Sequence, residues 1–495
     1  MREYHSYYFD SMGSDPVFDA FSIDPGTEMT EGLLRRLIDE FREEYVPRYK
    51  YLRMPWERKF EIFGRPPKPD WKPDNRLSAN FARSVTKTFE GYYIGNPVTL
   101  SIPDEAKAAW LTDYSRRVDQ ADVDADISNG CSCYGNAFEL LYQDENGLPS
   151  TTYVDPMRAF VVYDNTVQRK PVFGVIVSFD EHGRLFGEWY DDVRRVRYRD
   201  GGDTIVFEEI EPHYFGDVPL IEYVQDSNRE GLYEGVMNLI DAFNRCISEK
   251  ANDVEYFADA YLLVTGSELP DDFKEDLQKM RLINLWGDAG IDVRFVQKPD
   301  SDVTQEHLLN RLETLIYKNS MVPDITDDSF YTASGEALEK RLLPMSNMAK
   351  TKDRKFVSSI RRRLRLLCNY PNQPFAGDDW VSVEIQMHRN EPKNVQAEAS
   401  VAASLSGVVS RETQLKMLSF VDDPRAEMAR LDEERQAAAA ISTDNYSTSR
   451  EPTMYEITSV LSKYKRGSLK RTNALKMLVK IGVDEMEAEA LLDDV

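Results

Sequence analysis

Residues that bind metals or form disulfides are scarce in this sequence. Its 495 residues include four cysteines and five histidines. Cys131 and Cys133 are one residue apart, closer than the spacing of structural zinc sites, and so few cysteines do not make a disulfide framework. The histidines are scattered, and none pairs in sequence with a cysteine or carboxylate at metal-ligand spacing. We therefore expect no metal and no other cofactor, and buried small side chains at the cysteines.

Long apolar runs are also missing. No run approaches the roughly 18 residues that suggest a membrane span, and residues 1–5 lack the apolar core of a secretion signal. We therefore expect no membrane contact and translation into a cytoplasm. The composition, 41% hydrophobic and 11% aromatic, is that of a folded chain, and its length indicates roughly two to four modules.

Motifs of common enzyme classes are absent as well. The sequence has no Gly-x-x-x-x-Gly-Lys-Ser/Thr phosphate loop, no Gly-x-Gly-x-x-Gly and no His-Glu-x-x-His. This excludes an ATPase of the phosphate-loop type, and we expect no enzymatic activity. Because catalytic groups can converge from distant positions, a nuclease or other hydrolase with a dispersed site remains an alternative.

Charge is unbalanced toward acid. The chain carries 61 basic and 86 acidic residues, a formal net charge of −25. Tight binders of nucleic acid are usually basic, so this balance argues against a firm grip on DNA. A channel is compatible with it, because acidic walls repel phosphates and keep a duplex centred. Many proteins are acidic for solubility alone, so the charge by itself selects no function.

Apolar periodicity in the first half predicts a mixed structure. Residues 1–30 are unpatterned, and residues 64–74 contain too many prolines for regular structure. Short runs rich in Val, Tyr, Phe and Thr, separated by turn signals, fill residues 138–223 and predict an antiparallel β-rich region. Helices are expected at 30–49, 75–91 and 104–129.

The second half predicts long helices around a compact module. Residues 231–260 carry one apolar stripe, and a helix of some 25 residues spans about 37 Å. A strand–helix–strand pattern follows at 261–296, and then a second long helix at 302–317. After a loop, a third helix runs from Ser334 toward Asn369, with a kink expected at Pro344. Long helices with one apolar stripe suit a ring in which each packs against its neighbour.

Several short segments, taken in their order and spacing, carry a family resemblance. They are Asn75–Asn80, Gly91–Pro97, Gly135–Tyr142, Val154–Pro156, Pro219–Tyr223, Ser334–Leu338, Asn390–Asn394, Ser410–Thr413 and Val421–Pro424. On these segments, over about residues 75–434, the chain resembles the portal proteins of tailed phages, in the branch typical of long-tailed phages of Gram-positive hosts.

The resemblance implies a portal fold of the α+β class, with a mixed α/β wing, a long-helix stem, a small α/β clip and a mainly helical crown. It divides the chain into an N-terminal arm and helix at 1–49, a wing at 50–230, a stem helix at 231–257, a clip at 258–301, a stem helix at 302–321, a tunnel loop at 322–335, a kinked helix and wing return at 336–394, and a crown with C-terminal helices at 395–495.

The resemblance also implies a function without chemistry of its own. Portal subunits form a ring, usually of twelve, at one capsid vertex, through which double-stranded DNA is packaged, retained and ejected. The implied partners are a terminase, the major capsid and scaffolding proteins and a head-completion adaptor. We therefore expect a virion protein that is assembled in the host cytoplasm. A virion adaptor ring that never touches DNA and a soluble monomeric binding protein remain alternatives.

The tunnel loop is the first candidate site. Its acidic side chains would keep phosphates from sticking, and its bulky ones would set the width of the bore. An ordinary solvated loop between two helices is the alternative. The candidate residues are Asp324, Thr326, Asp327, Asp328, Ser329, Phe330, Tyr331 and Thr332.

Three further groups are candidates for contacts with DNA or between subunits. Charged stem residues would line the tunnel or bridge subunits, a basic run would pair with a neighbour's acids or touch DNA, and two clip aromatics would contact a subunit or an adaptor. A solvated helix face and core packing are the respective alternatives. The stem residues are Arg245, Glu249, Lys250, Asp253 and Lys318; the basic run is Arg361, Arg362, Arg363 and Arg365, together with Lys350, Lys352, Arg354 and Lys355; the clip residues are Trp286 and Phe295.

Overall fold

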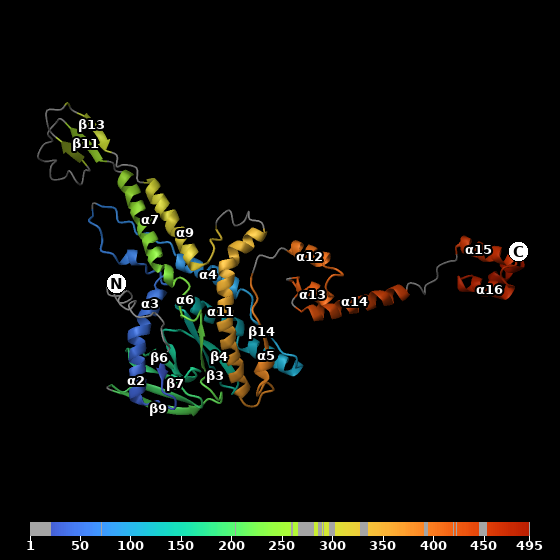
Figure 1. The fold of residues 1–495 in the computed structure, drawn as a ribbon, viewed down its shortest axis with the longest axis horizontal. Helices are drawn as coiled ribbons and strands as arrows, with labels where there is room; N and C mark the ends of the chain where they lie inside the picture. The colour runs from blue at the N-terminus through green and yellow to red at the C-terminus, as the bar shows by residue number, and fades with distance from the viewer. Residues whose placement is uncertain are drawn as a thin grey trace. The chain divides into compact units, whose positions relative to one another are not determined.

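The computed structural model describes residues 21–494 apart from 71, 203, 259–260, 266–281, 286–289, 291, 297–301, 327–334, 391–394, 419, 422 and 445–452. The chain divides into two compact units, Met1–Asn390 and Glu391–Val495. Helices combine with several small sheets, which confirms the expected α+β class (Figure 1). None of the described helices is long and apolar enough to cross a membrane.

The first unit begins with helices that pack on a sheet. Thr30 caps the first of them by accepting a hydrogen bond from the Leu33 N–H. Leu34, Leu37 and Ile38 form its buried face, as their helical spacing predicts. The segment consists of α2 (Glu31–Glu40), a π-helical turn (Phe41–Tyr45), α3 (Val46–Arg53) and a 3-10 turn (Glu61–Gly64).

Six strands form the larger sheet, in the order β1-β5-β6-β7-β8-β9. Neighbouring strands are antiparallel except β1 and β5, so the predicted antiparallel region is confirmed. Phe41, Phe160 and Trp189 belong to the core that this sheet shares with the N-terminal helices. The strands are β1 (Ser22–Ile23), β5 (Ala159–Asp164), β6 (Pro171–Phe179), β7 (Leu185–Tyr190), β8 (Arg194–Asp200) and β9 (Ile205–Pro212).

A smaller sheet, β10-β3-β4, supports two helices, α6 and the later helix α11 (Gly335–Asn369). The chain turns from α6 into β3 at Gly135, whose φ is 87°. A Cβ at this position would lie 1.8 Å from the Arg229 carbonyl oxygen, so the close approach requires glycine. The elements are α6 (Gln120–Tyr134), β3 (Asn136–Gln143), β4 (Pro149–Val154) and β10 (Leu220–Val224).

Two expected helices differ from the prediction. Residues 75–80 are not helical, and α4 begins only after Asn80, whose side chain caps it. The single helix expected at 104–129 is two helices, α5 and α6, because the backbone at Asp119 is left-handed, with φ 49°. The elements named here for the first time are α4 (Phe81–Tyr93) and α5 (Glu105–Arg117).

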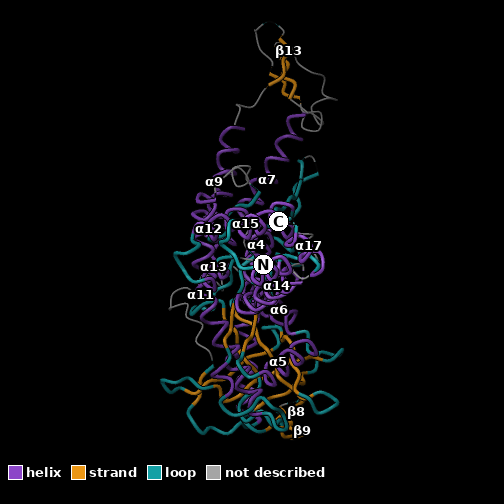
Figure 2. The backbone as a smooth tube through the Cα atoms, turned by 90° about the vertical axis from the view of Figure 1, so that its right-hand side faces the viewer, coloured by secondary structure: helices purple, strands orange, loops and turns teal. Residues whose placement is uncertain are grey.

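Two long helices form a hairpin, as predicted. α7 (Met237–Ala258) and α9 (Asp302–Ser320) pack against each other, and a small sheet stands at their far end (Figures 1 and 2). In that sheet β11 lies between β12, which is parallel to it, and β13, which is antiparallel. The helix expected near 271–280 lies outside the described residues. The strands are β11 (Tyr261–Thr265), β12 (Leu282–Leu285) and β13 (Asp292–Val296).

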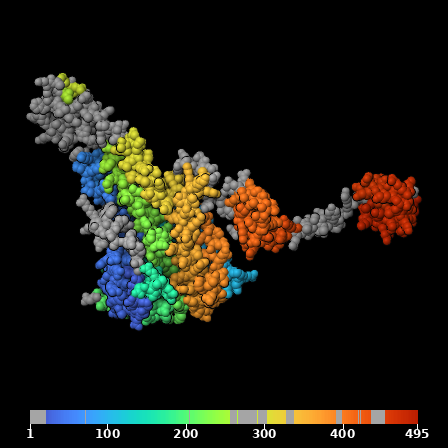
Figure 3. Space-filling view, viewed as in Figure 1, coloured from blue at the N-terminus to red at the C-terminus, as the bar shows by residue number. Residues whose placement is uncertain are grey.

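The third long helix, α11 (Gly335–Asn369), continues through Pro344. Figure 1 shows its N-terminal end inclined to the remainder, as expected where proline removes a backbone donor. Figure 3 shows that α7, α9 and α11 are each exposed on the same side of the first unit. Beyond α11, a 3-10 turn (Asp379–Ser382) leads to β14 (Glu384–Gln386), which pairs antiparallel with β2 (Thr99–Ser101).

The described elements of the second unit are helices, in agreement with the mainly helical C-terminal region expected. α13 packs against α12 and α14, and α16 packs against α15 and α17. The last three helices share a core of their own. The helices are α12 (Val395–Ser404), α13 (Arg411–Lys416), α14 (Pro424–Asp444), α15 (Met454–Lys465), α16 (Arg471–Lys480) and α17 (Glu485–Asp493).

Candidate functional site

The α7–α9 hairpin is held by a segment without helix or strand, residues 68–70 and 72–79, which we call the strap and which is extended over the residues that bind α7. Three of its backbone N–H groups donate to polar side chains of α7. The Asn75 N–H reaches Asn252 Oδ1 at 2.6 Å, the Leu77 N–H reaches Ser248 Oγ at 2.9 Å, and the Ala79 N–H reaches Asn244 Oδ1 at 2.7 Å.

Successive hydrogen bonds between the strap and α7 are possible because two residues of the strap and four residues of the helix advance by nearly the same distance. Two residues of extended chain advance about 6.6 Å, and four residues of α-helix advance about 6.0 Å. Bonds from every second strap residue therefore meet every fourth residue of α7. Asn244, Ser248 and Asn252 are buried, so the strap supplies partners that water cannot.

The strap also binds two carboxylates of α7, those of Glu249 and Glu255. Lys68 Nζ lies 2.8 Å from a Glu249 carboxylate oxygen, and Asn75 Nδ2 donates to Glu255 over 2.6 Å. The proline-rich region that the sequence marks as irregular is thus attached to α7 through Lys68, and residues 75–79, which were expected to be helical, continue this attachment as part of the hairpin's structure.

Most of the predicted stem residues have partners within the chain. Glu249 pairs with Lys68; Arg245 lies 3.7 Å from Glu61 on the 3-10 turn; Lys250 pairs with Glu306 across the hairpin; and Asp253 accepts a bond of 2.9 Å from Gln305. Lys318 is exposed on α9. The tunnel or intersubunit roles expected of these five residues stay predictions.

Aromatic rings fasten the base of the hairpin to the rest of the first unit. The Phe81 ring, at the start of α4, lies 4.8 Å from the Phe243 ring on α7 and 5.8 Å from the Tyr317 ring on α9, measured between centroids. Both contacts are edge-to-face, a favourable geometry for aromatic pairs. One side chain therefore contacts both long helices.

The expected tunnel loop starts with an ordered turn. Met321 adopts a left-handed backbone after α9 ends, and Val322 is buried. Asp324 then accepts hydrogen bonds from the Thr326 N–H and hydroxyl, at 2.9 and 2.7 Å. Burial raises the pKa of Glu313 on α9, and the nearby Asp324 carboxylate adds to the effect. The other predicted loop residues, Asp327, Asp328, Ser329, Phe330, Tyr331 and Thr332, lie outside the described residues.

The basic run on α11 splits into different environments. Arg361 is exposed. Arg362 and Arg365 both pair with Asp217, at 3.0 and 2.5 Å. Arg363 is only 2% exposed, so the expectation that it contacts DNA or a neighbouring subunit is wrong. A side chain that is buried in the core of its own subunit cannot contact DNA or a neighbouring subunit.

Arg363 is the centre of a buried network. Its guanidinium binds Asp124 of α6 at 2.5 Å, Glu139 of β3 at 2.7 Å and the Tyr223 hydroxyl of β10 at 2.9 Å. Burial raises the pKa of Asp124, and the adjacent guanidinium opposes that rise. The network joins α11 to α6 and to the small sheet, so its role is structural.

A second buried cation is Lys352, and its expected place in a basic run that contacts DNA or a neighbouring subunit is wrong, because its side chain is fully buried. Its ammonium lies 3.0 Å from each of Glu90 Oε1, the Ser128 carbonyl oxygen and Ser132 Oγ. It also lies 4.6 Å from the centroid of the Tyr93 ring. The available signal was position: Lys352 and Arg363 fall on the apolar stripe of α11, where a solvated charge is not expected.

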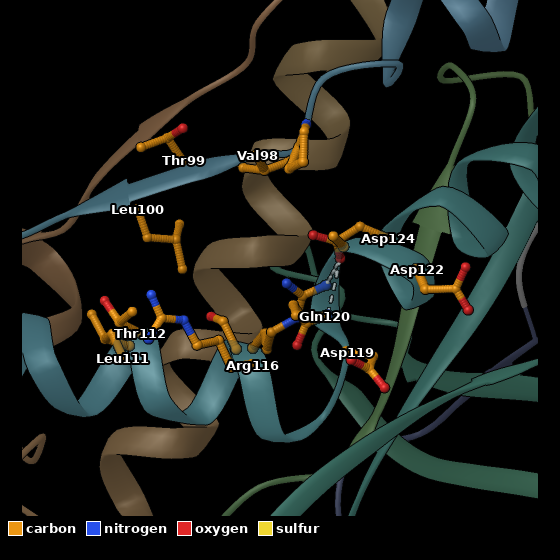
Figure 4. A pocket seen from close by; sticks show the side chains of 14 residues that line it. Val98, Thr99, Leu100, Leu111, Thr112, Arg116, Asp119, Gln120, Asp122 and Asp124 are labelled. Carbon is orange, nitrogen blue, oxygen red and sulfur yellow. Dashed lines mark hydrogen bonds and ion pairs between the residues drawn. The ribbon is translucent and has the colours of Figure 1, made fainter. Parts of the chain in front are cut away.

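A cavity of about 610 Å³ lies between β2, α5 and the start of α6, with Arg363 on its wall. Figure 4 shows Leu100 of β2 pointing toward α5, with Gln120 and Asp124 on the α6 side. The Arg363 donors are bound to Asp124 and Glu139.

Within the part of the chain that the structure describes, no group of three or more His, Cys, Asp or Glu residues could hold a metal ion.

The two clip residues give no side-chain information. Trp286 lies outside the described residues, and Phe295 is a residue of β13 that pairs with Leu262 of β11. Their predicted contacts with a subunit or an adaptor stay predictions.

Comparison with known proteins agrees with the resemblance found in the sequence segments. The family model "Phage portal protein, SPP1 Gp6-like" matches residues 35–440. The portal protein of Bacillus phage SPP1 is 23% identical over 444 residues, which cover 81% of this chain and 86% of that protein. The hairpin, the strap, the start of the loop and α11 all lie within the family match. The chain therefore belongs to the phage portal protein family, and it is a portal subunit.

Proposed function

We propose that this subunit forms a ring-shaped channel at one capsid vertex, through which double-stranded DNA is packaged, retained and ejected. The α7–α9 hairpin would form the stem, the β11–β13 sheet the clip, and the segment between α9 and α11 the tunnel loop. Membership of the portal family supports this proposal, together with the long hairpin braced by the strap.

The hairpin is the observation that carries the proposal. A helix pair that extends from a folded body can be repeated around an axis only if its direction is fixed. The strap bonds to α7 and the Phe81 contacts to both helices fix that direction. Each subunit would then present the same surface to the next one, as a closed cyclic ring requires.

The channel would act on DNA without catalysis. Asp324, with Asp327 and Asp328, would repel the phosphates and keep the duplex from sticking, while Phe330 and Tyr331 would narrow the bore. A terminase would supply the energy from ATP, since no phosphate-loop motif occurs in this chain. The major capsid protein, a scaffolding protein and a head-completion adaptor would be the other partners. The ring would assemble in the host cytoplasm and become part of the virion.

Electron microscopy of the purified chain, with native mass spectrometry of the same sample, tests the proposal. We expect closed rings with a central hole and a mass close to twelve subunits. A monomer or dimer that persists when the capsid and scaffolding proteins are added would contradict the ring. Rings with another subunit number would contradict only the stoichiometry.

A further inference from the structure

The last three helices form a small module outside the family match, which ends at residue 440. α15, α16 and α17 enclose their own core, in which Ala474 and Leu478 of α16 are fully buried. Thr453 caps α15 in a capping box with Glu456, so the module has a defined start. Its surface is therefore set by its own fold.

The charge of this module is strongly segregated. From Lys463 to Lys480 the sequence contains seven basic residues and no acidic one, although the whole chain has a net charge of −25. All seven are exposed. We call these exposed side chains, which lie in α15, in α16 and in the connection between them, the basic face. Its residues are Lys463, Lys465, Arg466, Lys470, Arg471, Lys476 and Lys480.

Most of the basic face is not neutralised within the described part of the chain. Arg471 pairs with Asp493 of α17. The other six basic residues have no acidic partner among the described residues. An isolated group of like charges repels itself, and that repulsion falls when an anion binds across it.

The helix dipole accounts for only part of this pattern. Lys463, Lys465 and Lys480 stand in last turns, where cations are favourable. Lys470 is the N-cap of α16 and Arg471 its first residue, where cations are unfavourable. The Lys470 side chain makes no capping hydrogen bond. Negative charge from a partner would compensate the cost at this end of the helix.

We propose that the basic face binds the phosphate backbone of double-stranded DNA without sequence preference. Lysine is a compact point charge that binds phosphates without a demanding geometry, and repeated phosphates match cations spread over two helices. The choice of DNA as the polyanion rests on the proposed function. The basic face belongs to the second unit and the proposed channel segments to the first, so the face would give the subunit a second group of residues that contacts the genome.

The test is fluorescence anisotropy of the full chain with a short labelled duplex, titrated with salt. Lysine-to-glutamine changes at three positions, K463Q/K470Q/K476Q, remove three contacts from exposed sites and leave the core unchanged. We expect affinity at low salt to fall at least about tenfold, and the slope of log K against log salt to decrease in magnitude by about 2.7. A chain ending at residue 444 should lose the same binding.

A matched variant, K59Q/K170Q/K416Q, makes the same charge change at exposed lysines elsewhere and should bind like the wild type. Equal loss in both variants, or no loss in either, would overturn the proposal. So would competition by polyglutamate as strong as that by unlabelled duplex, because it would indicate an acidic protein surface. Circular dichroism of each variant checks the fold. If imaging finds no ring, the proposed function fails, while DNA binding remains measurable on the single subunit.

Discussion

Lys352 Nζ donates a hydrogen bond of 3.0 Å to Glu90 Oε1 in the core of the first unit, where the two side chains are 0% and 8% exposed. The pair connects α11 to α4, the helix that also contacts both members of the hairpin. Removal of both charges from water is costly, and their contacts to each other and to Ser128 and Ser132 offset that cost. The position of α11 thus depends on this ion pair. Loss of either charge alone would leave the other charge buried without its partner.

Lys352→Met should therefore destabilise the first unit by about 3–5 kcal/mol, because it leaves the Glu90 carboxylate buried without its partner. The double variant Glu90→Gln/Lys352→Met should recover part of the loss, since no charge remains buried. Denaturant midpoints measure both. Lys350→Met, at an exposed position of the same helix, should change stability by less than about 0.5 kcal/mol. Equal losses in the single and double variants would argue against the ion pair as the cause.

Periodicity was sufficient to predict the helices of the hairpin and α11, although Val254 of α7 and Leu308 of α9 are 64% and 49% exposed. Periodicity gave no information about the partners of the buried charges. Arg363 meets Asp124 and Glu139, which precede it by more than 220 residues, and no local pattern encodes that distance. Lys352 and Arg363 lie on the same stripe of the helix as Phe356, Ile360 and Leu364. This position predicts that their side chains are buried, but it does not identify the residues that they contact.

The strap was not predicted: residues 64–74 were expected to be irregular, and residues 75–79, which make its three backbone bonds to α7, were wrongly expected to be helical. Proline excluded regular structure at 64–74, yet the sequence does not state where an irregular segment lies. The signal was on the other element: Asn244, Ser248 and Asn252 recur every four residues on α7. A row of short polar side chains on one helix face indicates an extended chain bound along it. The loop residues from Asp327 to Thr332 stay predictions.

The strap bonds can be removed without touching an apolar contact. Asn244→Ala/Asn252→Ala should free the N–H groups of Asn75 and Ala79 and cost about 1–2 kcal/mol for each lost bond. Hydrogen–deuterium exchange should become faster in residues 75–79. Asn238→Ala, which changes an exposed position of α7, serves as the control. Unchanged exchange in the double variant would show that these bonds do not hold the strap.

His213 should make the stability of the first unit depend on pH. Burial lowers its pKa from the ordinary 6.5. The Phe215 N–H donates to Nδ1 at 3.2 Å, and Nε2 lies 2.9 Å from the Asp191 carbonyl oxygen, so the neutral ring fits and a second proton on Nδ1 would break a bond. The unfolded chain binds this proton more tightly than the folded one, so stability is full above pH 6.5 and is lost as pH falls through the lower folded value.

Melting temperatures between about pH 7 and pH 5 measure this effect against the usual range of histidine titration. The wild type should lose more stability over this interval than His213→Gln, whose side chain does not titrate. His388→Gln, at an exposed histidine, should keep the wild-type dependence. Parallel curves for the wild type and His213→Gln would exclude His213 as the source.

Charge reversal in the loop tests its place in the channel. Asp324→Lys/Asp327→Lys/Asp328→Lys would put a ring of cations around the duplex, and phosphates would bind to it. We expect particles assembled with this subunit to contain severalfold less protected DNA, measured after nuclease treatment. The corresponding Asn variant removes the repulsion without adding attraction and should have a smaller effect. Normal DNA content with the Lys variant, in particles that carry intact rings, would place the loop away from DNA and favour an adaptor ring that never touches the genome.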